Sequence, residues 1–399
     1  MEQSVVRSIS AGLSQKGVRN HNERLLLSLL QRHGDMPGSD LAKLTSLSPP
    51  TVSAILKRLE AEGLLMRGDP VRGKVGKPSV PMGLSPDGVL SFGLKLGRRS
   101  ADLLLMDFTG TVRTQRRLRY DQPHPETVFD FLAAGIAEIT GALPTDAAKR
   151  ICGIGVAAPF EMWNGPAQGG PGNDVFRPWL DIHIPQEIAR FSALPVSLVN
   201  DATAACRAEH IYGRGRAFRD YAYFFVGAFV GGGIVLNHSV FEGRRGNAGA
   251  LGSLRSIGPN GETKQLVDMA SLHTLEARLT EVDIDPALIW RSPQDWTGIA
   301  RYVEPWLGQT AQELAKASLS TCSVIDFEAV LIDGAFPAEI RDELVARVNR
   351  YIGNQDMRGL IAPAIVAGAV GGNARAIGAA CGPIFAQFLL NTNAGLAVA

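Results

Sequence analysis

Cysteine is scarce in this 399-residue sequence, and the four that occur, Cys152, Cys206, Cys322 and Cys381, form no C-x-x-C pair. This scatter argues against a disulfide framework and a cysteine-lined zinc site, and it favours a reducing compartment. Long apolar runs are missing too, since no stretch reaches the roughly 18 uninterrupted apolar residues of a membrane helix. The first residues lack the apolar segment of a signal peptide. We therefore expect a cytoplasmic protein with no membrane partner.

Net charge is also small, at +1, but it is unevenly distributed along the chain. Residues 1–85 carry 12 Lys and Arg against 7 Asp and Glu, a net of +5, whereas the remainder carries 28 against 32, a net of −4. A basic head on a mildly acidic body is expected when only the head meets a polyanion. The length exceeds what a single core usually fills, so we expect more than one domain.

The basic head has the helix pattern of a winged helix-turn-helix. A leucine-rich helix is predicted over 19–33 and a short second helix over 39–46, with Ser39 as its N-cap and Leu44 facing inward. A tight turn follows, and a third helix is predicted from about residue 49 to 62, with proline in its first turn and glycine at its end. This order predicts an N-terminal DNA-binding domain over residues 1–85.

The third helix separates an apolar face from a polar one. Val52, Ile55, Leu56 and Leu59 repeat at helical spacing and should be buried. Short polar side chains at the helix start can then reach base edges, while cations farther along and in the basic loop after the helix can reach phosphates. The residues predicted to contact double-stranded DNA are Ser39, Thr51, Ser53, Lys57, Arg58, Arg72, Lys74 and Lys77. The alternative is an ordinary three-helix domain followed by a solvated basic loop.

Beyond about residue 85 the pattern changes to apolar strands separated by glycines. Three successive strands are predicted over 89–97, 101–108 and 111–120. Further buried strands fit RICGIGVAAP, LPVSLVND and YAYFFVGAFVGGGIVLN, and helices are predicted over 126–142, 201–213, 337–352 and 374–390. Such alternation indicates an α/β domain over residues 86–399.

These segments together closely resemble the ROK family of repressors, open reading frames and kinases, in particular its winged-helix repressors. The resemblance covers nearly the whole chain and rests on LSPPTVSAILKRLEAEGLL, GLKLGRRSADLLLMDFTGTV, GIGVAAP, VNDATAACRAEH, VGAFVGGGIV, GNAGALGS and GNARAIGAA. It implies two lobes of the actin and hexokinase type that close around a sugar. The expected small lobe spans about 86–195 plus the C-terminal helix, and the large lobe about 196–375.

Both phosphate loops depart from the pattern of the family's kinases. Where those kinases have D-x-G-G-T-K, this chain has KLGRRS, so Lys95 reverses the charge of an acidic residue and Arg98 replaces a glycine. Where they have G-T-G-I-G-G-G, this chain has GAFVGGG, and Phe229 stands where phosphate oxygens would pack against backbone. We therefore expect no catalytic residue and no ATP turnover, although arginines in the first loop leave anion binding open.

The expected effector site is also reduced. Asn200 and Asp201 match a family Asn-Asp pair whose Asp is the general base in kinases, and they follow a predicted strand. The alternative is that Asp201 only caps the helix that begins at Ala202. In the family motif A-G-E-I-G-H, the Glu and His are here Ala250 and Ser253, which removes two sugar-binding groups. The predicted effector contacts are Asn200, Asp201, Asn173, Asn247 and Ser253.

No metal or cofactor is expected. The family's zinc segment C-x-C-G-x-x-G-C-L-E aligns with residues 258–267, where Gly258, Asn260 and Gln265 replace the three cysteines and Val267 replaces the final Glu. A tetrahedral zinc site needs four such ligands.

Three functions remain open. The first is a DNA-binding regulator of carbohydrate-related genes, for which the resemblance implies repression relieved by an effector, with activation as the alternative. Its ROK domain would sense a sugar or sugar derivative and form a homodimer or a dimer of dimers on a palindromic operator. The second is an active ATP-dependent sugar kinase with a regulatory head. The third is a regulator without an effector, whose second domain is only a dimerisation scaffold.

Overall fold

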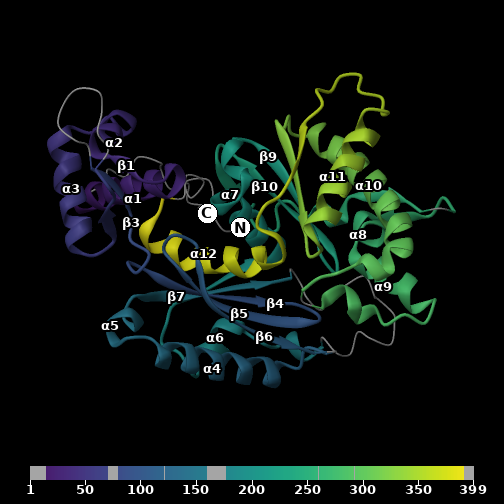
Figure 1. Ribbon diagram of the computed structural model, residues 1–399, viewed down its shortest axis with the longest axis horizontal. Helices are drawn as coiled ribbons and strands as arrows, with labels where there is room; N and C mark the ends of the chain where they lie inside the picture. Colours follow the sequence, from purple (N-terminus) through teal and green to yellow (C-terminus); the bar gives the residue numbers. More distant parts are fainter. Residues whose placement is uncertain are drawn as a thin grey trace, which may run out of the picture. The chain divides into compact units, whose positions relative to one another are not determined.

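The computed structural model describes residues 15–70, 80–120, 122–159, 177–258, 260–291 and 293–390. The chain divides into two compact units (Figure 1). The first comprises the residues up to Gly88 together with Phe385–Leu390, and the second runs from Val89 to Ile384. Within the described ranges no helix is both long and apolar enough to cross a membrane.

The first unit is a three-helix domain with a small sheet, which confirms the predicted winged helix-turn-helix fold. Its helices are α1 (Gln15–His33), α2 (Gly38–Thr45) and α3 (Pro49–Ala61). Its strands are β1 (Met36–Pro37), β2 (Leu65–Arg67) and β3 (Pro81–Leu84), paired antiparallel in the order β1-β3-β2. The strands β2 and β3 border the basic loop that sequence patterning assigns to the wing.

The core of this unit follows the predicted faces, with two corrections in α2. Val52, Ile55, Leu56 and Leu59 of α3 are all buried, as expected. Ser39 is wrong as an N-cap, because α2 begins at Gly38 after Pro37, whose side chain offers no acceptor. Leu44 is also wrong as a core residue, since it is 56% exposed while Leu41 and Ala42 of the same helix are buried.

The last residues of the chain that the structure describes also belong to the first unit. The Arg24 guanidinium in α1 donates to the backbone carbonyls of Ala386 and Gln387, and the Leu390 N–H donates to the Ser28 hydroxyl. A cation near unpaired carbonyls at a helix end is favourable. The end of helix α12 (Ala374–Phe388) is therefore part of the domain that the N-terminal helices build.

The second unit begins with a mixed five-stranded sheet in the order β6-β5-β4-β7-β8. The predicted meander is confirmed as antiparallel β4 (Leu90–Leu96), β5 (Ser100–Asp107) and β6 (Val112–Arg119). Two parallel strands, β7 (Ile151–Ala158) and β8 (Val196–Asn200), extend it. The accompanying helices are α4 (Pro125–Ala142), α5 (Thr145–Ala148) and α6 (Ile184–Ala189), with a short 3₁₀ turn over Arg177–Trp179.

A second five-stranded sheet has the order β11-β10-β9-β14-β15. Its strands are β9 (Tyr221–Val226), β10 (Val230–Leu236), β11 (Ser239–Phe241), β14 (Ala329–Gly334) and β15 (Ala364–Ala367). The small pair β12 (Arg255–Ile257) and β13 (Thr263–Gln265) stands apart from it. The helices that accompany the second sheet are α7 (Asp201–Tyr212), α8 (Leu266–Met269), α9 (Leu272–Thr280), α10 (Ala300–Cys322) and α11 (Ala338–Ile352). Short 3₁₀ turns cover 214–217, 251–253, 286–290, 297–299 and 371–373.

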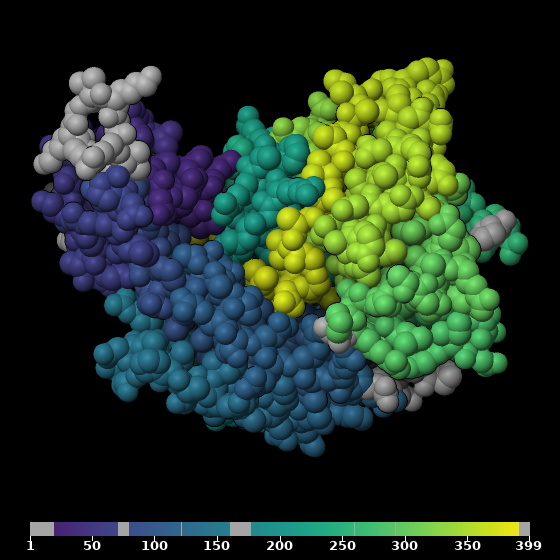
Figure 2. All heavy atoms as spheres, in the orientation of Figure 1, coloured from purple at the N-terminus to yellow at the C-terminus, as the bar shows by residue number. Residues whose placement is uncertain are grey.

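Helix α12 lies directly against the first sheet, between it and helix α7 (Figure 1). A Cβ added at Gly93 of β4 would lie 2.1 Å from the Ala376 carbonyl oxygen, and one at Gly155 of β7 would lie 1.8 Å from that of Ala379. The glycines therefore allow the helix backbone to approach the sheet more closely than any side chain would permit. In Figure 2 yellow C-terminal residues lie directly beside the blue residues of the first sheet.

Candidate functional site

The exposed face of α3 presents the residues predicted to meet DNA bases. Thr51, Ser53 and Lys57 are all exposed. The Ser48 hydroxyl caps the helix by accepting from the Thr51 N–H at 3.4 Å, and the two hydroxyl oxygens of these residues lie 2.8 Å apart. The start of the helix therefore carries short polar groups in a defined arrangement.

Arg58, which is also predicted to contact DNA, is less exposed than these three residues. Its guanidinium forms an ion pair with Glu23 of α1, and its side chain is only 27% exposed. This ion pair links α3 to α1. Ser39 remains exposed at the start of α2. Arg72, Lys74 and Lys77 of the predicted wing lie outside the described residues.

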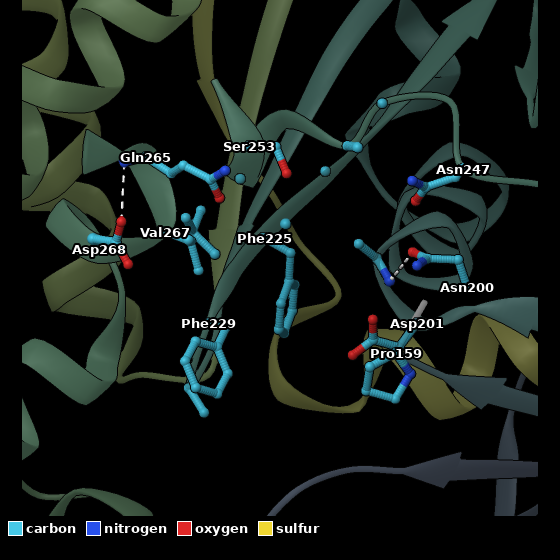
Figure 3. A pocket seen from close by; sticks show the side chains of 18 of the residues that line it. Pro159, Asn200, Asp201, Phe225, Phe229, Asn247, Ser253, Gln265, Val267 and Asp268 are labelled. Carbon is cyan, nitrogen blue, oxygen red and sulfur yellow. Dashed lines mark hydrogen bonds between the residues drawn. The ribbon is translucent and has the colours of Figure 1, made fainter. Parts of the chain in front are cut away.

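A cavity of about 580 Å³ in the second unit brings together four of the five predicted effector contacts, Asn200, Asp201, Asn247 and Ser253. The fifth, Asn173, lies outside the described residues. In Figure 3 Asn200, Asp201 and Asn247 lie on one side of the cavity and Gln265, Val267 and Asp268 on the other, with Phe225 between them. The volume is within the usual range for small-molecule sites.

Asn200 and Asp201 have different roles at the start of α7. The Asn200 side-chain oxygen accepts from the backbone N–H groups of Ala202 at 3.0 Å and Thr203 at 3.2 Å, so Asn200 is the N-cap. The alternative in which Asp201 caps this helix is therefore wrong. The Asp201 carboxylate instead pairs with Arg375 at 3.4 Å. It is held by a guanidinium and faces the cavity.

Lys95 of the altered first loop is buried and satisfied within its own sheet. Its ammonium donates to the Ser100 hydroxyl at 2.8 Å and to the Asp102 carboxylate at 3.2 Å. Burial, followed by the nearby Arg375 guanidinium, lowers the pKa of Lys95 to about 8. A positive group at the position where related kinases have a carboxylate opposes the binding of a divalent cation there.

The two altered loops meet at an aromatic stack in the cavity wall. The guanidinium carbon of Arg98 lies 4.6 Å from the ring centroid of Phe229, and the Phe229 ring lies 5.0 Å from that of His273. Burial lowers the pKa of His273, so the neutral imidazole is favoured. Bulky rings therefore occupy the part of the second loop in which the family's kinases rely on bare backbone.

The segment that matches the family's zinc site does not fit a zinc ion. It folds as the β12–β13 hairpin, in which the Glu262 carboxylate accepts from the Asn260 N–H at 3.0 Å and the Asp268 carboxylate from that of Gln265, also at 3.0 Å. Within the described ranges no group of three or more His, Cys, Asp and Glu is arranged to hold a metal ion. Gln265 and Val267 line the cavity instead.

Arg375 is one of the cavity residues that sequence reasoning missed. It follows Ala374 at the start of α12, where the positive end of the helix dipole disfavours a cation. A cation in such a place indicates a specific anionic partner, and the structure supplies one in Asp201. The sequence therefore contained a signal for Arg375, although its partner lies 174 residues away.

Two protein families match parts of the chain. Residues 91–381 match the ROK family, and residues 19–66 match a winged helix-turn-helix DNA-binding family. The xylose repressor of Bacillus subtilis is 23% identical over 243 residues, which cover 60% of this chain and 62% of that protein. The chain thus spans less than two thirds of that relative's length.

Solved structures share the fold. A ROK family transcriptional regulator described as a homologue of the Escherichia coli MLC protein aligns with a TM-score of 0.62 and 20% identity, over 91% of this chain and 94% of its own. A ROK family glucokinase from Streptomyces griseus aligns with a TM-score of 0.56 and 18% identity, over 73% of this chain and 98% of its own. The chain therefore belongs to the ROK family and carries an N-terminal winged helix-turn-helix DNA-binding domain.

Proposed function

We propose that this protein is a cytoplasmic transcriptional regulator of carbohydrate-related genes. Its winged helix binds a DNA operator, and its ROK domain senses a sugar-type effector and forms a dimer. The observation that carries the proposal is that one chain has both a helix, α3, with an exposed polar face and a cavity large enough for a small molecule. In a dimer, two α3 helices would meet successive half-sites of an inverted repeat.

The ROK domain is proposed to be catalytically inactive. A sugar kinase needs a carboxylate free to accept the proton of the attacking hydroxyl, whereas Asp201 is engaged by Arg375. It also needs cation-assisted phosphate binding, whereas the buried Lys95 ammonium stands in the first loop. Both changes affect the transfer step and leave the cavity open to a ligand.

DNA binding is tested by a gel shift with the region upstream of the protein's own operon. Salt-sensitive, sequence-specific retardation is expected, and Lys57→Ala should weaken it because a phosphate contact is lost. Lys149→Ala is the matched control, since Lys149 is an exposed lysine of the second unit that pairs with Asp146. Equal affinity of the two variants, or no specific retardation, would contradict the proposed interface.

An active kinase is the second candidate, because Asp201 faces the same cavity as Gly231 and Gly232 of β10. A coupled assay of ADP release across hexoses and amino sugars decides between the two. We expect no turnover above background. Turnover that disappears in Asp201→Ala would establish the kinase and refute inactivity.

A further inference from the structure

The cavity of the second unit is lined by more cations than anions. Two acidic residues, Asp201 and Asp268, face four basic ones. The basic residues are Arg98, Arg255, Lys264 and Arg375. A concave wall with an excess of one charge focuses the field on the ligand inside it. The potential in this cavity therefore favours a negatively charged occupant.

The guanidinium groups of two of these arginines lie over phenylalanine rings of the wall. Arg98 lies over Phe229 at 4.6 Å, and Arg375 lies over Phe225 at 4.9 Å, measured from the guanidinium carbon to the ring centroid. The ring quadrupole attracts a cation over the aromatic face, and the fork of N–H donors on a guanidinium suits the oxygens of a carboxylate or a phosphate. Two arginines placed over rings in one cavity are thus suited to an oxyanion.

Asp201 satisfies Arg375 only in part. Its carboxylate reaches Arg375 through a single contact of 3.4 Å, at the long end of a hydrogen bond. The Nε of Arg375 is buried and has no hydrogen-bond partner among the described residues. Burial lowers the pKa of Arg98, and the Asp201 carboxylate acts in the opposite direction. A guanidinium removed from water is stabilised by further acceptors.

We infer that the effector is a carbohydrate derivative bearing a carboxylate or a phosphate, which Arg98 and Arg375 hold together. The inference rests on the proposed role of this cavity as the effector site. Asn247, Ser253 and Gln265, which line the cavity away from the Phe229 stack, remain for the hydroxyl groups. Arginine recognises both carboxylate and phosphate through paired hydrogen bonds, so the two chemistries share one binding mode.

The test is calorimetry on the full chain with matched probes. Each of glucose, galactose and mannose is compared with its uronic acid and its 6-phosphate, and inorganic phosphate is included alone. At least one charged derivative should bind ten-fold or more tightly than its neutral parent, and its affinity should fall with added salt. The two charged series distinguish a carboxylate from a phosphate effector.

Variants of Arg98 and Arg375 test whether these two residues cause the preference for charged ligands. Arg98→Gln and Arg375→Gln should each remove most of the charged-over-neutral preference, and Arg375→Lys, which keeps the charge but not the paired donors, should restore part of it. Arg358→Gln is the matched control, because Arg358 is 91% exposed and pairs with Asp356 outside the cavity. Thermal melting of each variant shows that it is folded.

Several outcomes would overturn the inference. They are equal or tighter binding of a neutral parent, a preference that both Gln variants retain, binding of inorganic phosphate as tight as that of any sugar derivative, and no binding by any charged derivative. Each leaves the gel shift of the ligand-free protein unaffected. Failure of this inference is therefore distinguishable from failure of the proposed DNA-binding function.

Discussion

Gly378 is the position at which a single methyl group should have the largest effect on the second unit. A Cβ built there lies 1.7 Å from the carbonyl oxygen of Ala204 and 2.4 Å from its carbonyl carbon, whereas ordinary contact begins near 3.4 Å. The obstacle is the backbone of α7, which no rotamer change can remove. For Gly378→Ala, helices α12 and α7 must therefore separate.

Overpacking of a close contact costs about 1–3 kcal/mol and more where the backbone must move, so we expect Gly378→Ala to lower the free energy of unfolding by about 3 kcal/mol. Gly308→Ala is the matched control, because Gly308 lies inside α10 and a Cβ there meets nothing within 4 Å. That change should raise the free energy of unfolding by about 0.5–1 kcal/mol, the ordinary gain of alanine over glycine within a helix.

Urea unfolding followed by tryptophan fluorescence measures both variants. All five tryptophans lie between residues 163 and 306, so the signal reports on the second unit. The same variants test the cavity, because α7 carries Asp201 and α12 carries Arg375. Separation of the helices should weaken effector binding in Gly378→Ala alone. Equal stability of Gly378→Ala and the parent, or an equal loss in both variants, would refute the steric argument.

Three further predictions concern other contacts. Burial, with the nearby Glu209 carboxylate, raises the pKa of Asp333 to about 6, so the native state holds this proton more tightly than the unfolded chain does. The protonated carboxyl therefore contributes about 3 kcal/mol to the free energy of unfolding at low pH, and this contribution is lost as the pH rises from about 4 through 6. The difference in urea midpoint between the parent and Asp333→Asn should therefore change across that window. Arg24→Ala removes two hydrogen bonds to the end of α12 and should cost about 1 kcal/mol, seen as faster amide hydrogen exchange in α1. Ser48→Ala removes the cap of α3 and should cost about 1 kcal/mol, measured by the thermal melting of far-ultraviolet circular dichroism.

Local patterning predicted the elements whose faces are decided by neighbours in sequence. The four buried residues of α3 and the strand meander β4–β6 are examples, because helical repetition and apolar runs are properties of single segments. Helix α10, the longest described helix, was missed. Pro305 and Gly308 interrupt its helical pattern, and its buried face packs into the apolar core around the second sheet.

For the residues of the cavity, too, the sequence predicted one part and the structure decided the rest. The sequence identified Asn200, Asp201, Asn247 and Ser253 through motifs that resemble a known family, and these four residues line one cavity. It could not distribute their roles, since capping by Asn200 depends on where α7 begins.

The sequence by itself determined the family, the order of the two domains and the positions at which the kinase and zinc motifs are altered, because these are properties of residue type and spacing. Only the tertiary structure decided what replaces them. The Arg375–Asp201 pair joins residues 174 positions apart, and it forms because α12 approaches the first sheet and α7 through glycines that no local pattern relates to one another. Packing over such sequence distances, and the charge balance of the cavity that results from it, exists only in the folded chain.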